Sequence, residues 1–144
     1  MNAHNVSVAA EAFAAAQFAR LGFDVSVQYG ANQPENDLIV AREDLLLKIS
    51  VKGSQDGSWG LTQSYMGKGK KADYHGAIDT WLQKHGSKTV LCFVQFMNIS
   101  DIRLPNMYLA RPAEVAARLR ATSGGRGDTI LYERHTWTSR STRA

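Results

Sequence analysis

The spacing of apolar residues predicts where the chain forms helices. Near the N-terminus these residues recur every three or four positions, which is typical of the buried face of a helix. We therefore expect a helix over Val6–Leu21, capped by Asn5 or Ser7 and ended by Gly22. Similar spacing predicts helices over Lys70–His85 and in the segment AEVAARLR after Pro112.

Alternating or continuous apolar runs predict the strands. The run FDVSVQY alternates apolar and polar residues, as a half-buried strand does, and TVLCFVQF is apolar throughout, as in a strand covered on both faces. Gly and Ser are frequent between residues 53 and 69, where we expect a long loop. The expected strands are Phe23–Tyr29, Asp37–Ala41, Leu45–Lys52, Lys88–Phe96, Asn106–Ala110 and Thr129–Arg134.

This order of elements predicts an α/β fold. We expect one domain over residues 1–144, with its core from about residue 6 to residue 134 and a polar, basic tail over 135–144. The sheet should be mixed, should begin with an antiparallel meander of three strands, and should carry helices on both faces.

Composition narrows the class of protein. An apolar content of 44% and a charged content of 21% are normal for a soluble domain, and no apolar run reaches the ~18 residues of a membrane span. We therefore expect no membrane partner and a cytoplasmic location. The single cysteine, Cys92, lies in an apolar run, where a buried small side chain is favoured over a nucleophile.

Charge is distributed unevenly along the chain. Residues 1–47 hold two basic and six acidic residues, whereas residues 48–144 hold fifteen basic and seven acidic residues. An acidic cluster beside a basic remainder suits a metal site within a phosphate-binding surface. The alternative is a mildly basic protein whose net charge of +4 serves no specific partner.

The turn between the second and third strands gathers polar residues. With a tip of two or four residues, Asp37 pairs with Ser50, at a Cβ separation of ~4.5–5.5 Å. Asp37 then shares a face with two lysines, and a carboxylate beside an ammonium group suits the metal-assisted hydrolysis of phosphodiesters. The expected core face of the third strand holds Leu45, Leu47, Ile49 and Val51, and its polar face holds Leu46, Lys48, Ser50 and Lys52.

Several stretches resemble the PD-(D/E)XK nuclease superfamily, in particular the archaeal Holliday junction resolvases and the small endonucleases related to an intron homing enzyme. They are GFDVSVQYGANQPENDLIV, LLLKISVKGS, KKADYHGAID and YLARPAEV, and the resemblance covers roughly Val6 to Arg120. It implies a restriction-endonuclease-like fold, DNA as substrate, Mg²⁺ or Mn²⁺ as cofactor and a homodimer.

The resemblance also implies roles for individual residues. Asp37 stands at the position of the metal-binding aspartate, Lys52 at that of the catalytic lysine, and Glu11 at that of a first-helix glutamate that binds metal. The backbone carbonyl of Val51 would be a further metal ligand. Ser50 stands where the second acidic residue is expected, and its hydroxyl brings no charge to the site.

The substrate side is expected in a loop rich in glycine and lysine. A flexible basic loop suits contact with phosphates of any sequence, and the alternative is a solvated loop. Trp59 lies nearby, and packing on the core is favoured there over stacking on a base. The candidate DNA-binding residues are Lys48, Gln63, Tyr65, Lys68, Lys70 and Lys71.

Each of these residues also has an ordinary interpretation, and three functions remain open. Asp37 could be a turn residue, Lys48 and Lys52 solvated strand lysines, and Glu11 an exposed helix residue. A migrated carboxylate from Glu35 or Asp56 could replace the acid missing at Ser50. The three functions are a Mg²⁺-dependent endodeoxyribonuclease, a catalytically impaired nuclease fold that binds DNA or regulates, and a protein-interaction domain.

Overall fold

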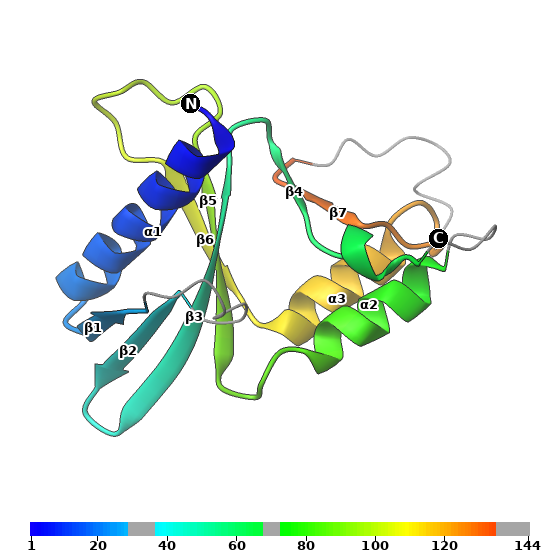
Figure 1. Ribbon diagram of the computed structural model, residues 1–144, viewed down its shortest axis with the longest axis horizontal. Helices are drawn as coiled ribbons and strands as arrows, with labels where there is room; N and C mark the ends of the chain where they lie inside the picture. Colours follow the sequence, from blue (N-terminus) through cyan, green and yellow to red (C-terminus); the bar gives the residue numbers. More distant parts are fainter. Residues whose placement is uncertain (29–36, 68–72, 135–144) are drawn as a thin grey trace. The chain divides into compact units, whose positions relative to one another are not determined.

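The computed structural model describes residues 1–28, 37–67 and 73–134 (Figure 1). Within these limits the chain forms two compact units, and each is described below by itself. The first unit consists of Met1–Gly57 and Gly86–Arg111, and the second of Ser58–His85 and the chain from Pro112 onward.

A five-stranded sheet forms the centre of the first unit. The strand order is β1-β2-β3-β5-β6; β3 and β5 run parallel, and the other neighbours run antiparallel. The expected α/β class, the mixed sheet and the opening meander are therefore confirmed. The strands are β1 Asp24–Val27, β2 Leu38–Arg42, β3 Leu45–Ser54, β5 Thr89–Gln95 and β6 Asn106–Ala110.

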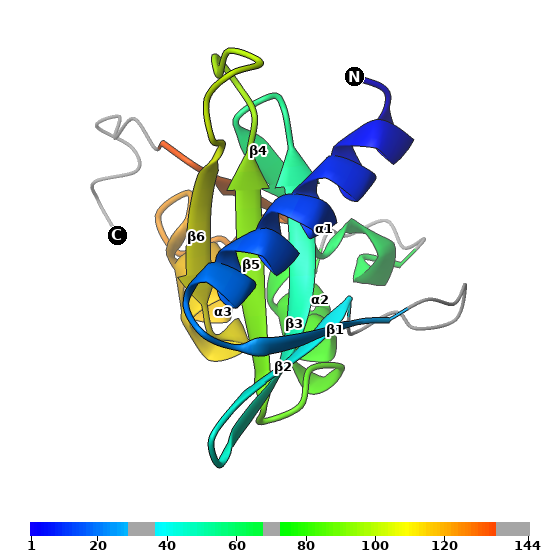
Figure 2. The ribbon, with the colours of Figure 1, turned by 90° about the vertical axis from the view of Figure 1, so that its left-hand side faces the viewer.

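One helix covers a face of this sheet. α1 (Ala3–Arg20) lies obliquely across the strands, as Figure 2 shows. Its cap is Asn2, whose side chain accepts a hydrogen bond from the Asn5 backbone N–H, so the expected cap at Asn5 or Ser7 is wrong by one turn. Gly22 follows the helix end with a φ of 90°, a left-handed conformation that favours glycine. The buried residues of α1 are Val6, Ala10, Ala14 and Phe18, whereas Leu21 is half exposed.

β3 extends past the expected strand end at Lys52. Gly53 lies in the strand, and a Cβ built there would meet Ala10 Cβ at 2.9 Å and the Val6 carbonyl oxygen at 3.1 Å. The missing side chain therefore lets the backbone of α1 come close to the strand. Because side chains alternate along a strand, Gly53 also marks the face of β3 that α1 covers.

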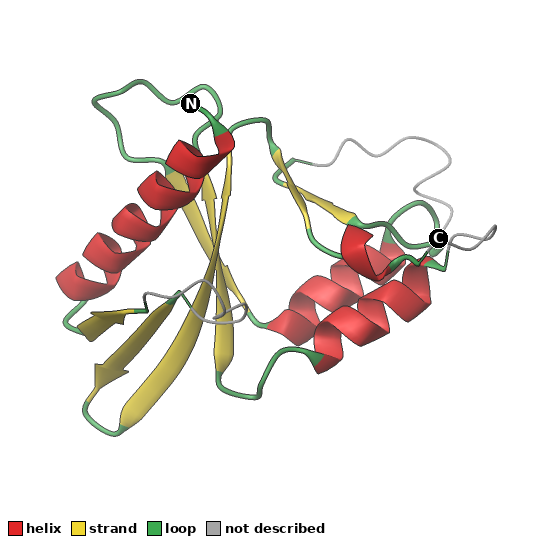
Figure 3. Ribbon diagram, in the orientation of Figure 1, coloured by secondary structure: helices red, strands yellow, loops and turns green. Residues whose placement is uncertain are grey.

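The second unit holds the remaining elements (Figure 3). The expected loop over residues 53–69 contains the end of β3, a short strand and a 3₁₀ turn, because Trp59 is buried and its strand pairs with a later one. α2 begins at Tyr74, where Asp73 caps it by accepting a hydrogen bond from the Gly76 N–H; Lys70 and Lys71 lie outside the described residues. The elements are β4 Ser58–Gly60, η1 Gln63–Tyr65, α2 Tyr74–Gln83, α3 Pro112–Ala121 and β7 Ile130–Tyr132.

The remaining expectations about the fold concern helices. α1 packs on one face of the five-stranded sheet, and helices on both faces remain a prediction because α2 and α3 belong to the other unit. Among the described residues, no helix combines the length and the apolar character that crossing a membrane requires. The restriction-endonuclease-like arrangement also stays a prediction.

Substituting Gly53 by alanine is expected to destabilise the first unit. The added methyl group would press on Ala10 and on the Val6 carbonyl, and overpacking of this kind costs about 1–3 kcal/mol. Urea unfolding of Gly53→Ala and of Gly86→Ala would measure it, since a Cβ at Gly86 meets only the Thr89 hydroxyl, at 3.8 Å. Equal stabilities of the two variants would contradict a close contact between α1 and β3.

Candidate functional site

The β2–β3 hairpin has the expected register. Arg42 pairs with Leu45 across a two-residue tip, and the ladder continues to Leu38 opposite Ile49. The core face is shorter than expected, because Leu45 at the hairpin tip is 44% exposed. Its placement in the core is therefore wrong.

Asp37 lies in the bend just before β2. Its backbone N–H donates to the Ile49 carbonyl at 2.8 Å, and its Oδ2 accepts the Val51 N–H at 2.6 Å. Asp37 thus spans Ser50 with two hydrogen bonds, whereas the direct pairing expected between these two residues is not part of the ladder. These contacts hold the Asp37 carboxylate at the edge of the sheet, beside β3.

The Val51 carbonyl belongs to the same edge. The N–H and C=O groups of one strand residue point to the same side of the strand. Since the Val51 N–H points to Asp37, its carbonyl oxygen also lies on the side of β3 that faces Asp37. The Val51 carbonyl oxygen and the Asp37 carboxylate therefore lie on the same side of β3, just before the first residue of β2.

Glu11 approaches this edge from α1. Burial, the negative charge of Asp37 and a side-chain hydrogen bond with Asp37 together raise the pKa of Glu11 above its ordinary value of 4.5. The Asp37 carboxylate therefore acts on a carboxyl group from an element distant in sequence. The role that the resemblance gives Glu11, that of a metal ligand beside Asp37, stays a prediction.

The two lysines of β3 leave the strand on the other face. Ile49, Val51 and Gly53 face α1, so Lys48 and Lys52 point away from it. Within the described part of the chain, no ion pair joins Asp37 to either lysine. The clustering of Asp37 with Lys48, Ser50 and Lys52 on a single polar face stays a prediction.

Ser50 is almost completely buried, with 1% of its surface exposed. It lies between the two hydrogen bonds that tie Asp37 to β3. A buried carboxylate at this position would need a cation or several hydrogen-bond donors, because burial penalises its charged form. The serine needs neither.

The other candidate residues are not in this hairpin. Gln63 and Tyr65 form η1 in the second unit, and Lys68, Lys70, Lys71 and Glu35 lie outside the described residues. Asp56 is exposed and its Oδ1 accepts a hydrogen bond from the Ser54 hydroxyl at 3.0 Å. This hydrogen bond to Ser54 does not bring the Asp56 carboxylate to Asp37. Trp59 packs in the interior of the second unit, as the sequence favoured.

The edge site offers a limited set of ligands for a cation. Glu11 and Asp37 supply two carboxyl groups and Val51 a carbonyl oxygen, all hard oxygen donors of the type that Mg²⁺ binds. The described residues contain no group of three or more His, Cys, Asp or Glu side chains that could hold a metal. A set of two carboxyl groups fits Mg²⁺ or Mn²⁺ only where water and substrate oxygens complete the shell.

The sequence pattern missed one partner in this site, the Val51 backbone N–H. A side chain that accepts from a backbone N–H leaves no signal in residue types, and the hydrogen bond depends on Asp37 lying outside the ladder rather than in it. The signal that could have been used is the Asn-Asp pair ahead of the apolar run, since aspartate often bonds backbone N–H groups in bends.

Replacing Glu11 by glutamine should change how stability depends on pH. Because the folded-state pKa of Glu11 is raised, the stability contributed by its proton is full below pH 4.5 and is lost as the pH rises through the folded value. Glu11→Gln should therefore gain stability relative to wild type between pH 4 and pH 7. Urea unfolding at both pH values measures this, with Glu43→Gln at the exposed hairpin tip as control. A gain that is the same at both pH values would rule out the carboxyl contact.

The comparisons with known proteins add no relative. The sequence has no significant match among protein-family models, curated proteins or solved structures. The chain is therefore described here by its α/β architecture with a mixed five-stranded sheet and by the carboxyl pair at the sheet edge.

Proposed function

We propose that this chain is a metal-dependent endonuclease that hydrolyses DNA phosphodiester bonds, of the PD-(D/E)XK type that its sequence resembles. The observation that carries the proposal is the Asp37 carboxylate, held to β3 by the Val51 N–H and in contact with Glu11. Two contacting carboxyl groups at an open sheet edge are unfavourable without a counter-charge, and a divalent cation supplies one.

Each residue has a role in this proposal. Asp37, Glu11 and the Val51 carbonyl would hold Mg²⁺ or Mn²⁺, which stabilises negative charge on a phosphate when bound. Lys52 would orient the attacking water or accept its proton, and Lys48 would contact the DNA backbone. Lys52 is half-buried and Lys48 exposed, which suits these different tasks. The homodimer that the resemblance implies is part of the same proposal.

Removing either the proposed metal ligand Asp37 or the proposed catalytic residue Lys52 should abolish DNA cleavage. We expect Mn²⁺ to bind wild type and Asp44→Ala but not Asp37→Ala, since Asp44 lies at the exposed hairpin tip. Lys52→Ala should cut branched or linear DNA at least ~100-fold more slowly than wild type, the usual contribution of a positioned acid or base. The matched control is Lys88→Ala, an exposed lysine at the start of β5. Calorimetry, cleavage assays and thermal unfolding of each variant provide the readouts.

Two results would contradict the proposal. Cleavage by Lys52→Ala at the wild-type rate would remove the lysine from the mechanism. Absence of Mn²⁺ binding and of cleavage in wild type would remove the activity itself.

Ser50 favours a second candidate function, a nuclease fold that binds DNA without cutting it. The missing acid leaves the site with two carboxyl groups, and the serine is buried where a third would stand. In that case DNA affinity should be present and should fall steeply as salt concentration rises, because phosphate contacts release counterions.

Ser50→Glu should separate the two candidates. A buried glutamate is expected to lower stability without a cation and to regain it with Mn²⁺, which unfolding curves with and without Mn²⁺ would show. If the wild-type site is active, both proteins cut. If the serine has abolished catalysis, only Ser50→Glu cuts, and DNA binding without cutting by either protein leaves the binding function alone. Ser50→Ala, which adds no charge, is the control for the substitution itself.

A further inference from the structure

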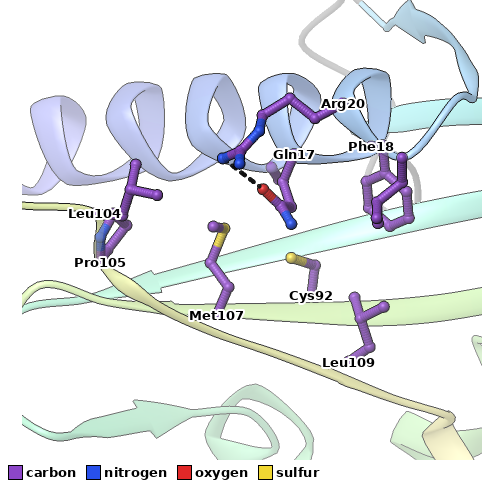
Figure 4. Close-up of a pocket in the computed structure, with 10 residues that line it drawn as sticks. Gln17, Phe18, Arg20, Cys92, Leu104, Pro105, Met107 and Leu109 are labelled. Atoms are coloured by element: carbon purple, nitrogen blue, oxygen red, sulfur yellow. Dashed lines mark hydrogen bonds between the residues drawn. The ribbon is translucent and has the colours of Figure 1, made fainter.

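A pocket lies between the C-terminal half of α1 and the strands β5 and β6, within the first unit. Its volume is about 410 Å³, in the ~300–1,000 Å³ range of sites for small molecules. In Figure 4 the side chains of Gln17, Cys92 and Met107 point into the same space. It shares no residue with the edge site of Asp37, Glu11 and Val51.

The inner wall of this pocket is apolar and uncharged. Phe18 and Cys92 are 5% and 2% exposed, and the half-exposed Leu109 of β6 continues the apolar lining to the rim. Burial raises the pKa of the Cys92 thiol to about 11, so this sulfur is neutral at physiological pH. The interior therefore suits a hydrocarbon group.

The mouth of the pocket carries a positive charge. Arg20 lies in the last turn of α1, is exposed, and donates from Nη1 to Gln17 Oε1 at 3.3 Å. None of the described residues that line the pocket is acidic. A guanidinium carries five N–H donors, so a single neutral acceptor leaves Arg20 able to bind a carboxylate in bidentate geometry.

We propose that this pocket binds a small amphiphile with a carboxylate head, its chain packed against Phe18, Cys92 and Leu109 and its head at Arg20. A volume of about 410 Å³ lies within the range of sites for small molecules, so a medium-length chain such as that of octanoate has room. The combination of an apolar wall and one cationic rim residue suits this occupant better than a fully apolar or a multiply charged one.

The test compares octanoate with 1-octanol, which has the same chain and no charge. Binding is followed by amide NMR shifts and by protection of Cys92, the single cysteine of the chain, from a thiol reagent. The variants are Arg20→Gln and Leu109→Ser, both at exposed rim positions. The controls are Arg103→Gln and Ile102→Ser, which are exposed and do not line the pocket.

We expect octanoate to bind saturably, with shifts centred on Phe18, Cys92 and Leu109. Arg20→Gln should weaken octanoate about tenfold and leave 1-octanol nearly unchanged, because only the charged head loses a partner. Leu109→Ser should weaken the binding of both octanoate and 1-octanol, and the control variants should bind both ligands as wild type does. All these readouts are independent of DNA cleavage.

Three outcomes would overturn the proposal. They are the absence of saturable binding, shifts centred away from the pocket, and an equal loss of both ligands in Arg20→Gln. Protection of Cys92 that grows with protein concentration in the absence of octanoate would also overturn it, since it would mean that a second copy of the chain covers the pocket.

Discussion

The close packing of α1 on β3 determines where both sites of the first unit lie. Gly53 has no side chain, so the helix approaches the strand until Val6 and Ala10 nearly touch it. Ala14, one turn further along and fully buried, keeps the helix close to the sheet along its length. The N-terminal half of α1 thereby carries Glu11 to the sheet edge, and its C-terminal half forms one wall of the apolar pocket.

At the sheet edge, attraction and repulsion act on the same carboxylate. The Val51 N–H holds the Asp37 carboxylate in place through a hydrogen bond of 2.6 Å. Burial and the neighbouring Asp37 carboxylate raise the pKa of Glu11. A protein that keeps such a pair without a counter-ion loses stability at neutral pH, which is why the pair is informative about function.

The sequence predicted most of the first unit because its signals are local. The spacing of apolar residues predicted α1. The two-residue tip at Glu43 and Asp44 predicted the hairpin register, and that register places Asp37 beside β3. The bend at Asp37 was not predicted, since the Asn-Asp pair is its only local signal and the hydrogen bond that holds it goes to the Val51 backbone. Trp59 illustrates another limit: its short strand pairs with residues about seventy positions later, and no local pattern reports such a partner.

The sequence did not predict the apolar pocket beside α1, for a related reason. Arg20, Cys92 and Leu109 belong to three elements, and their residue types are those of an ordinary helix end and two ordinary strands. Ser50 presents the opposite case, a residue noticed because it departs from a pattern. Its burial gives that departure a physical meaning: a serine at this depth is compatible with the fold whether or not a cation is bound, whereas an acid would make folding depend on one. At position 50, the fold is therefore separable from the chemistry of this edge.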